Sequence, residues 1–500
     1  MAKKKTPSSA DPSARHQFRA VIDIGSNSIR LVIFDGPRRA PLSICNEKAL
    51  CGLGRDLEPG GTLNPDAVAE AIATLKRFKL ILNAYSNPPV QAIATSAVRE
   101  ASNGADFVEM VGELGFDVDI ITGEEEAQLA AYGVMAVEPD ADGLIGDMGG
   151  GSLELVAVKN STMAGSVSMP IGPLSLMREG VSDLKNAQKV IDEHYSKTKL
   201  IKQKTFKTIY TVGGAWRTLA RIHINLKHYP LSVLHHYELS AQSAIETCDL
   251  VARQSRRSLE EVPGISRKRV DTLPIAALAL KALLLKVKAE RVVVSAGGVR
   301  EGLLLRALSD EERSIDPLYA AAEFYSARYS PNEKFGPAVL KIIDPLFSDI
   351  AKPCRRLLPI VTMLTDIAAY SHPDLRGRQA FDTALSAPFV NLSHEDRVWI
   401  ALVLYCRYDG RNAAFPNERA ISLLSWDRQQ SAAQVGLALR FLASLAPKSP
   451  KLLKEVTLKK TDSELIFSAT DDFVSLMGES PRKRLDALAT ALEREMVVEG

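Results

Sequence analysis

LIGDMGGGSLELVAV, residues 144–158, is the stretch of sequence that decides the fold. It predicts an apolar strand that ends at Asp147, a turn of three glycines and a serine, and an alternating strand over 153–158 that carries Glu154. Successive glycines allow backbone N–H groups to turn around an anion, and the two carboxylates can hold a divalent cation against it. Taken alone, the stretch fits either such a phosphate-and-metal site or an ordinary glycine-rich hairpin.

A near-copy earlier in the chain favours the first interpretation. VIDIGSNSIRLVIF, residues 21–34, repeats the order of strand, aspartate, small-residue turn and strand. Its Asp23 corresponds to Asp147, 124 residues later (147 − 23). We therefore expect two facing loops of one design.

Composition limits the classes of function. A chain of 500 residues that is 46% hydrophobic can bury large cores, and its length predicts about three domains. The net charge of +2 gives no bulk attraction to nucleic acid or membrane, so a polyanion would need a local basic groove. The five cysteines never form a CxxC pair, which disfavours a disulfide framework or a zinc site and indicates a reducing cytoplasm.

The chain divides into segments of different character. Residues 1–16 predict a disordered basic tail, and strands alternate with helices from residue 17 to residue 306, which predicts mixed sheets flanked by helices. We expect α/β domains over 17–135 and 136–306. Residues 307–500 predict a mostly helical third domain with a small hairpin and a last helix over 482–496. The apolar helix over 273–287 is too short to span a bilayer.

Two further glycine pairs lie where a strand hands over to a helix. They are Gly213–Gly214 and Gly297–Gly298, and backbone amides at such a position favour phosphate. A glycine pair there is common, so each pair alone is a weak signal. Four glycine-rich turns between residues 21 and 306 are a stronger one.

The segment TGEEEAQLAAYG, residues 122–133, supplies a candidate base. With Thr122 as N-cap, Glu125 completes a capping box, which explains Glu124 and Glu125 structurally. Capping does not explain Glu126, which a helix N-terminus would keep ionised, as a general base requires. Arg99 ends a predicted buried strand nearby, where its guanidinium suits either a phosphate or an ion pair with a helix carboxylate.

Other chemistries lack their motifs. The sequence contains no HExxH pair, no GxSxG elbow and no GxxxxGK[ST] loop. Zinc hydrolysis, serine acylation and P-loop chemistry are therefore disfavoured.

Six segments together resemble the exopolyphosphatase and guanosine pentaphosphate phosphatase (Ppx/GppA) family. They are VIDIGSNSIRLVIF, ATSAVREASN, ITGEEEAQLAAYGV, IGDMGGGSLELV, TVGGAWRTLA and SAGGVREGLL, in this order between residues 18 and 306. The resemblance implies two actin-like domains of the ribonuclease H-like, sugar kinase and heat-shock ATPase superfamily, followed here by the mainly helical domain.

The resemblance also implies roles for individual residues. Glu126 would be the catalytic base, and Arg99 and Glu154 would be further catalytic residues, with Arg99 in contact with phosphate. The metal-associated acids would be Asp23, Asp147 and Glu154. The expected phosphate contacts are Gly25, Ser26, Asn27, Ser28, Gly149, Gly150, Gly151, Ser152, Gly213 and Gly214. Mg²⁺ or another divalent cation is the implied cofactor, with K⁺ as a further candidate ion.

The implied reaction removes the terminal phosphate of linear inorganic polyphosphate by in-line attack of water. Hydrolysis of guanosine pentaphosphate to tetraphosphate is the alternative, and the same chemistry permits both activities. A polyphosphate or alarmone sensor without turnover and an ATP-dependent kinase are less favoured. We expect a cytoplasmic homodimer, with no nucleic acid or membrane as a partner, in keeping with the cysteine usage and the net charge.

The third domain departs from long family members at their histidine–aspartate motif. Thr365 precedes Asp366 where a histidine is usual, and CRYDGR carries Asp409 at a second such place. We expect a degenerate site there, in a domain that dimerises or extends a track for a long chain. Basic clusters could line that track or form solvated faces: Arg355–Arg356, Arg376 and Arg378, Lys459–Lys460, and residues 482–484.

Overall fold

The computed structural model describes residues 17–55, 57, 60–178, 183–202, 204–262, 265, 269–410 and 415–499. The expected tail over 1–16 lies outside these residues. The chain forms two compact units, Met1–Ile315 and Asp316–Gly500. Within the described residues, no helix combines the length and the apolar character needed to cross a membrane. The domain limits expected at 135/136 and 306/307 stay predictions.

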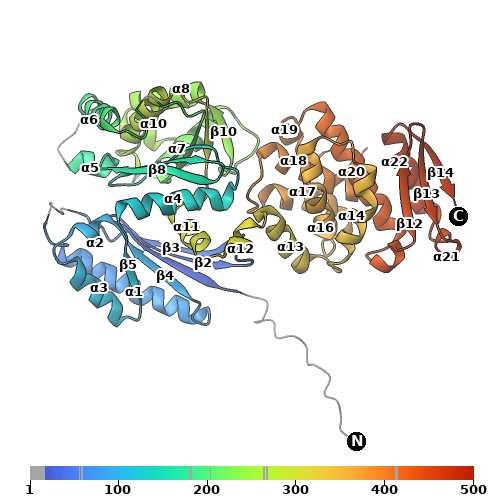
Figure 1. The fold of residues 1–500 in the computed structure, drawn as a ribbon, viewed down its shortest axis with the longest axis horizontal. Coiled ribbons are helices and arrows are strands. Elements are labelled where there is room, and N and C mark those ends of the chain that lie inside the picture. The colour runs from blue at the N-terminus through green and yellow to red at the C-terminus, as the bar shows by residue number, and fades with distance from the viewer. Residues whose placement is uncertain are drawn as a thin grey trace, which may run out of the picture. The chain divides into compact units, whose positions relative to one another are not determined.

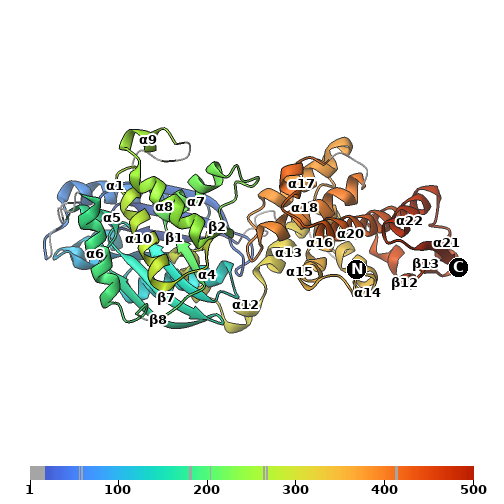
Figure 2. The ribbon, with the colours of Figure 1, turned by 90° about the horizontal axis from the view of Figure 1, so that it is seen from above.

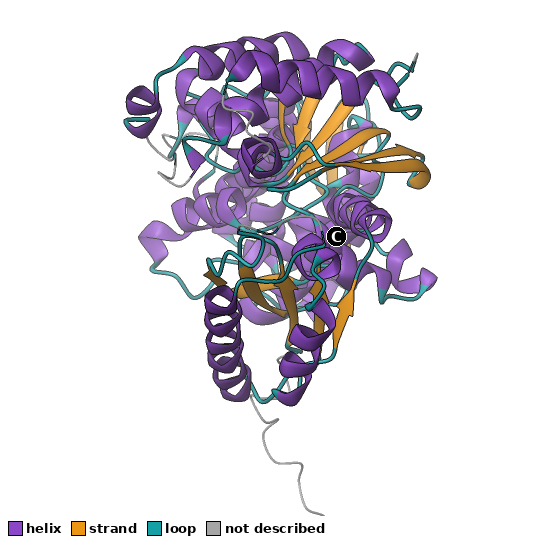
Figure 3. Cartoon of the chain, turned by 90° about the vertical axis from the view of Figure 1, so that its left-hand side faces the viewer, coloured by secondary structure: helices purple, strands orange, loops and turns teal. Residues whose placement is uncertain are grey.

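The first unit contains two mixed sheets with helices around them, which Figure 3 shows as two groups of strands (Figures 1 and 3). The first sheet has the order β3-β2-β1-β4-β5. Its strands are β1 (Arg19–Ile24), β2 (Ile29–Asp35), β3 (Leu42–Ala49), β4 (Val90–Ala94) and β5 (Val118–Ile120). Its helices are α1 (Pro65–Ala84), α2 (Ser96–Glu100) and α3 (Gly104–Glu113).

The second sheet repeats this plan with one added edge strand, in the order β10-β11-β9-β6-β7-β8. Its strands are β6 (Gly143–Met148), β7 (Leu153–Lys159), β8 (Thr162–Met169), β9 (Thr208–Val212), β10 (Tyr237–Ser240) and β11 (Arg291–Val294). Its helices are α5 (Pro173–Arg178), α6 (Leu184–Lys197), α7 (Gly214–Leu226), α8 (Ala241–Arg253), α9 (Arg256–Glu260) and α10 (Leu273–Val287). The predicted duplication is therefore confirmed in the topology.

Two helices cross between the sheets, α4 (Gly123–Val137) and α11 (Val299–Arg306), and the short α12 (Asp310–Ser314) follows them (Figure 1). α4 follows the first sheet in sequence, yet Ala131 and Val134 pack against the second sheet. α11 follows the second sheet, yet Leu303 and Leu304 pack against Val21 and neighbouring residues of the first. Leu129 of α4 also packs with the first sheet, and Leu305 of α11 also packs with the second, so each helix packs against both sheets.

Glycines let these helices meet at backbone distance. A Cβ on Gly302 would lie 1.9 Å from the Leu129 carbonyl oxygen, and one on Gly133 would lie 2.0 Å from that of Gly298. A Cβ on Gly297 would likewise lie 2.0 Å from the Gly133 oxygen. Of the glycine pair before α11, Gly297 is thus required by helix packing, whereas a Cβ on Gly298 would meet only Cγ1 of Val212, at 3.2 Å.

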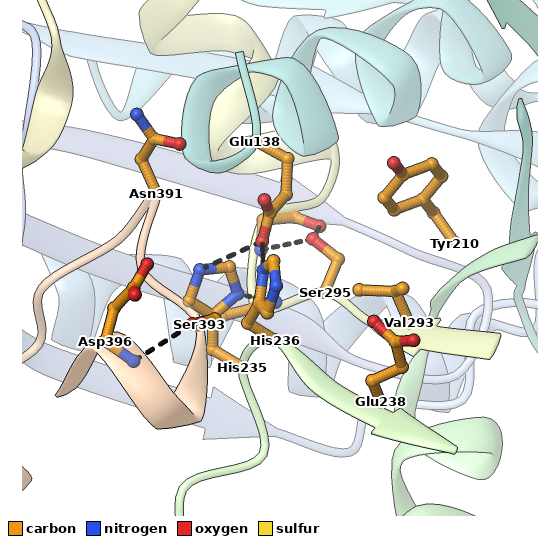
Figure 4. Close-up of polar contacts among 12 residues, drawn as sticks. Glu138, Tyr210, His235, His236, Glu238, Val293, Ser295, Asn391, Ser393 and Asp396 are labelled. Atoms are coloured by element: carbon orange, nitrogen blue, oxygen red, sulfur yellow. Dashed lines mark hydrogen bonds and ion pairs between the residues drawn. The ribbon is translucent and has the colours of Figure 1, made fainter. Parts of the chain in front are cut away.

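A cluster of polar side chains connects the C-terminal end of α4 to the turn before α11 (Figure 4). The buried Glu138, the C-cap of α4, has its Oε1 2.5 Å from Nδ1 of His236 and 3.5 Å from Nε2 of His235. The Ala296 amide donates to Nδ1 of His235 at 3.3 Å, and the Gly297 amide donates to Oγ of Ser295 at 3.1 Å. The cluster therefore ties the end of α4 to the turn that precedes α11.

The second unit begins as a helical array and ends in a small sheet of order β12-β13-β14 (Figure 2). Its helices are α13 (Pro317–Tyr329), α14 (Phe335–Leu346), α15 (Lys352–Arg356), α16 (Leu358–Met363), α17 (Arg376–Ser386), α18 (His394–Asp409), α19 (Glu418–Ile421), α20 (Trp426–Leu445), α21 (Asp471–Val474) and α22 (Glu479–Ala491). Short 3₁₀ turns are η3 (Leu364–Asp366), η4 (Pro373–Leu375) and η5 (Pro450–Leu453), and the strands are β12 (Val456–Lys460), β13 (Glu464–Ala469) and β14 (Glu495–Glu499). α18 is buried along most of its length, from Val398 to Cys406.

Two local expectations are wrong. The last helix was expected over 482–496, but α22 ends at Ala491 and Met496 lies in β14, which pairs with β13 in parallel. Glu493 has φ 56°, a left-handed conformation that cannot continue the helix. Arg99 was expected at the end of a strand, but it lies in the five-residue helix α2 after Thr95.

We expect Gly302→Ala to destabilise the protein by roughly 1 to 3 kcal/mol, because its methyl group meets backbone that cannot move aside. The measurement is the shift in the thermal unfolding midpoint. Gly112→Ala is the matched control, because a Cβ there meets no atom within 4 Å. It should leave the midpoint unchanged or raise it slightly. Equal midpoints for the two variants would contradict the proposed packing role.

Candidate active site

A cleft of about 340 Å³ lies where the two glycine-rich loops of the first unit approach each other. Residues 25–28 and 149–152 both line it. The loops are closed identically: the Gly25 amide donates to the Ser28 carbonyl oxygen at 3.0 Å, and the Gly149 amide to that of Ser152 at 3.0 Å. The two-loop arrangement predicted from the internal repeat is therefore present.

Neighbouring segments brace each loop. The amide of Gly54 donates to the Ser26 carbonyl oxygen at 2.7 Å, and the Ser26 hydroxyl lies 2.8 Å from that of Ser96. On the other side, the Leu174 amide donates to the Gly150 carbonyl oxygen at 2.8 Å. Both loops are thus held in place before any ligand arrives, which lowers the entropic cost of binding.

The side chains that reach the cleft follow from strand register. In β1, Val21 and Asp23 lie on the same face of the strand. Val21 packs on α11, and Asp23, two residues later on that face, lines the cleft. In β6, Ile145 and Asp147 do the same. Each aspartate therefore ends the inner, buried face of its sheet.

In the second sheet, a row of polar side chains crosses the strands at this level. Asp147 pairs in register with Glu154, and Glu154 pairs with Ser168. Ser168 donates a hydrogen bond to Oε1 of Glu154 at 2.8 Å. Glu154 is only 3% exposed and lies behind the residues that line the cleft.

Burial raises the pKa of these acids. It is the largest cause for Asp147, whose pKa rises to about 6, and for Glu154, whose pKa rises to about 7 because the Asp147 charge adds to the effect. The pKa of Asp23 is raised for the same first reason. An added cation would relieve this concentration of buried negative charge.

Glu126 lines the cleft from the first turn of α4. The predicted capping box is present, since the Thr122 amide donates to Glu125 at 2.8 Å and the Glu125 amide to the Thr122 hydroxyl at 3.1 Å. The hydrogen bonds that the Thr122 amide and hydroxyl donate to the Glu125 carboxylate lower its pKa, and Glu126 is not used by the cap.

The surroundings of Glu126 act against the effect expected from the helix N-terminus. Burial, followed by the charges of Glu154 and Asp147, raises its pKa well above the usual value. Desolvation by its neighbours outweighs the favourable helix dipole. A raised pKa brings the carboxylate nearer to the operating range of a general base.

Arg99 does not line the cleft. Its Nη1 donates to the Ile121 carbonyl oxygen at 2.7 Å and lies 4.0 Å from Oε2 of Glu126. Its charge lowers the pKa of Glu126 in part. Of the two roles left open for Arg99, the ion pair with a helix carboxylate is the one this geometry favours.

Gly213 and Gly214 line the cleft, and backbone packing requires the first of them, whereas the second faces the mobile end of an arginine side chain. Gly213 has φ 93°, and a Cβ there would lie 2.3 Å from the Met148 carbonyl oxygen. A Cβ on Gly214 would lie 2.4 Å from Nη2 of Arg269, whose Nη1 donates to the Gly214 carbonyl oxygen at 2.6 Å.

Sequence reasoning missed five cationic residues that line the cleft: Arg30, Lys48, Arg217, Arg269 and Arg300. Burial is the largest cause that lowers the pKa of Arg30 to about 10, followed by the charge of Arg300. Within the described part of the chain, none of Arg30, Lys48, Arg217 and Arg300 forms an ion pair with a carboxylate. These cations share the cleft with the buried Asp23 and Asp147, and the charges of Arg30, Arg217 and Arg300 offset part of the rise in the pKa of those acids.

Signals for some of these cations were present. Asp23 pairs in register with Arg30, and Arg30 with Lys48, so a charged row crosses the first sheet as one crosses the second. With the 124-residue offset between the two repeats, Arg30 occupies the position in the first repeat that Glu154 occupies in the second (154 − 124 = 30). Arg217 and Arg300 each lie in the first turn after a glycine pair. We find no such signal for Arg269.

In the second unit, Asp366 of the degenerate motif has a buried cationic partner. Nη2 of Arg407 donates to its Oδ1 at 2.8 Å, and Nε of Arg407 donates to the Thr365 carbonyl oxygen at 3.2 Å. Asp409 instead packs over Gly377, where a Cβ would lie 2.1 Å from its Oδ2. A guanidinium thus supplies the positive charge beside Asp366.

The paired sheets, the two closed loops and the cleft of acids and cations define a two-lobed phosphohydrolase with an actin-like fold. The chain belongs to the Ppx/GppA phosphatase family, whose sequence profile matches residues 32–311. A second profile, that of the exopolyphosphatase C-terminal domain, matches residues 351–497. The fold implied by the resemblance is therefore confirmed.

Individual relatives agree with this assignment. The chain is 27% identical to retrograde regulation protein 2 of Saccharomyces cerevisiae, over 78% of this chain and 72% of that protein. It is 25% identical to exopolyphosphatase 1 of Mycobacterium bovis, over 58% of this chain and 88% of that one.

Solved structures show the same fold in the first unit. A Ppx/GppA family member from Aquifex aeolicus is 27% identical with a TM-score of 0.52, over 58% of this chain and 97% of that one. An exopolyphosphatase from Cytophaga hutchinsonii is 26% identical with a TM-score of 0.54, over 59% of this chain and 99% of that one.

We expect Glu154→Gln to stabilise the protein in metal-free buffer above about pH 7, by roughly 1 to 3 kcal/mol. The pKa of Glu154 is raised from 4.5 to about 7 by folding, so the carboxylate destabilises the folded state increasingly as pH rises through this interval. The gain should disappear below pH 4.5, where both states are protonated. Unfolding midpoints against pH, with the exposed Glu113→Gln as control, measure it. A gain that is independent of pH would contradict the assignment.

Proposed function

We propose that this protein is an exopolyphosphatase that hydrolyses the terminal phosphate of linear inorganic polyphosphate. The observation that carries the proposal is the set of five cations beside Glu126 and the two amide-lined loops. A single phosphate needs fewer cations than this, whereas a chain with a negative charge on each unit matches several. The names of the relatives and of the C-terminal profile support the same substrate.

The proposed chemistry assigns a distinct task to each group. Glu126 accepts a proton from the attacking water while the bridging P–O bond to the terminal phosphate breaks. Amides of residues 25–28 and 149–152 stabilise charge on the terminal phosphate oxygens. Arg99 positions the Glu126 carboxylate, to which its Nη1 lies 4.0 Å away. The cations of the cleft hold the rest of the chain.

The acids fit a divalent cation of the Mg²⁺ kind. Within the described residues, no three side chains of His, Cys, Asp or Glu are arranged as a complete metal cage. Mg²⁺ commonly takes one or two carboxylates and completes its shell with water and substrate phosphates. Asp147 and Glu154 on the second sheet, with Asp23 facing them, would hold the ion, which would supply charge neutralisation at the terminal phosphate.

We also propose a cytoplasmic homodimer. The five cysteines are free thiols and four of them are buried, which suits a reducing compartment. The second unit exposes large apolar side chains, including Tyr370 at 78% and Trp426 at 68%, which support a role in dimerisation.

The test of function is phosphate release from long polyphosphate, triphosphate, guanosine pentaphosphate and ATP by one enzyme preparation. Long polyphosphate should be the best substrate, and Glu126→Gln should lower kcat on it by about 10²- to 10⁴-fold with little change in binding. Glu124→Gln, an exposed glutamate of the same turn, is the control. Preference for guanosine pentaphosphate would favour the alternative activity. Unchanged turnover of Glu126→Gln would remove that residue from the mechanism.

Asp147→Asn should raise the Mg²⁺ concentration needed for half-maximal activity by about tenfold or more, since the ion loses a charged ligand. A titration of initial rate against Mg²⁺ measures this shift. The exposed Asp119→Asn should titrate like the parent enzyme. Superimposable curves for Asp147→Asn and the parent would exclude Asp147 as a ligand.

A further inference from the structure

The cations of the cleft differ in how far they are exposed to solvent. Burial raises the pKa of Asp147, and the charges of Arg217 and Arg300 offset part of the rise, so these two cations act at the acidic end of the cleft. Lys48 also lines the cleft, but it is exposed, whereas the four arginines are half-buried. Lys48 therefore lies where the cleft opens to solvent, and we call this end the mouth of the cleft.

Strand register connects the mouth to the acids. Lys48 lies on β3, an edge strand of the first sheet (Figure 1). Asp23 of β1 pairs in register with Arg30 of β2, and Arg30 pairs with Lys48. Directly paired residues lie on one face of a sheet, and neighbouring strands lie about 4.8 Å apart, so the backbone of Lys48 lies about 10 Å from that of Asp23. The row Asp23, Arg30 and Lys48 thus leads from the acids to the mouth.

A cation from the second sheet's side acts on the same row. Nη1 of Arg269 is held by the Gly214 carbonyl oxygen at 2.6 Å. Partial burial is the largest cause that lowers the pKa of Lys48, followed by the charges of Arg30 and Arg269. The charge of Asp23 acts in the opposite direction. Positive charge thus lies on both sides of the mouth.

The ammonium group of Lys48 is open to a ligand. Within the residues that the structure describes, it forms neither a hydrogen bond nor an ion pair. Lysine carries a compact charge on a flexible stem, and it does not demand one orientation of its partner as the planar fork of arginine does. Such a group suits a chain of phosphates that advances as its end is removed.

We propose that Lys48 is a specificity-determining residue that favours long polyphosphate, and that the bound chain leaves the cleft across β2 and β3. The inference rests on the proposed function and gives the bound substrate a direction. With the terminal phosphate at the two glycine-rich loops, the next phosphates lie beside Arg30, and a chain long enough to cross two strands reaches Lys48. A short substrate ends before it can use this contact fully.

The test is the initial rate of phosphate release from triphosphate and from polyphosphates of increasing length, with KM expressed per chain. Lys48→Glu should raise KM for long chains by at least about tenfold, and KM for triphosphate by about twofold or less, because a like charge then meets only the distant phosphates. The effect should level off once the chain is long enough to reach residue 48.

Two further variants complete the experiment. Lys76→Glu is the matched control, because Lys76 is an exposed lysine of α1 that does not line the cleft, and it makes the same change in net charge. Lys48→Arg keeps the positive charge and should hold KM for long chains within about threefold of the parent value. Equal thermal unfolding midpoints of Lys48→Glu and Lys76→Glu show that the fold survives the substitution.

The results separate this inference from the proposed function. Equal rises in KM for triphosphate and long chains in Lys48→Glu, or no rise for either, would overturn the inference and leave the proposed function standing. Equal effects of Lys48→Glu and Lys76→Glu would show general attraction by net charge and would also overturn it. A parent enzyme that releases no phosphate from polyphosphate would overturn the proposed function, and this inference with it.

Discussion

The contact on which the first unit depends is the crossing of α4 and α11, where backbone meets backbone. Helices normally pack through their side chains. Gly133 and Gly302 have no side chain, so the backbones of the two helices come into direct contact at these positions. The apolar residues on either side then divide between the two sheets. Ile145 and Val134 pack toward one sheet, and Val21 and Leu303 pack toward the other.

The crossing also fixes the electrostatics of the cleft. Asp23 and Asp147 lie on the strand faces that α4 and α11 cover, at the end of that buried surface, where both acids line the cleft. The first turn of α4 adds Glu126 to the same cleft. Their charges are costly there, as the raised pKa values show. The opposing cations, Arg30 and Lys48 among them, are also only partly hydrated. Burial thus acts against charges of both signs in the same cleft, and the proposed metal-bound polyanion would bring charges of both signs to it.

The features that could be predicted from the sequence depend on residues close together in the chain or on the internal repeat. The capping box of Thr122 and Glu125 depends on residues three apart, and the loops after Asp23 and Asp147 were visible as a duplication. Features that depend on distant residues were missed or mistaken. The row from Arg30 to Lys48 needs the strand register, and the contact of Gly302 with Leu129 needs the helix crossing. Met496 was assigned to a helix because its parallel partner in β13 cannot be inferred from the residues beside it.

The packing of α11 against both sheets has a consequence for synthesis of the chain. The inner face of the first sheet, with Val21 and Phe34 almost fully buried in the finished protein, stays without Leu303 and Leu304 until residues near 306 have been made. The order of assembly is therefore not the order of the sequence, because the earliest strands wait for one of the last helices of their unit. A nascent chain of this design leaves part of this apolar surface uncovered until residues near 306 have been made, and uncovered apolar surface favours aggregation during synthesis.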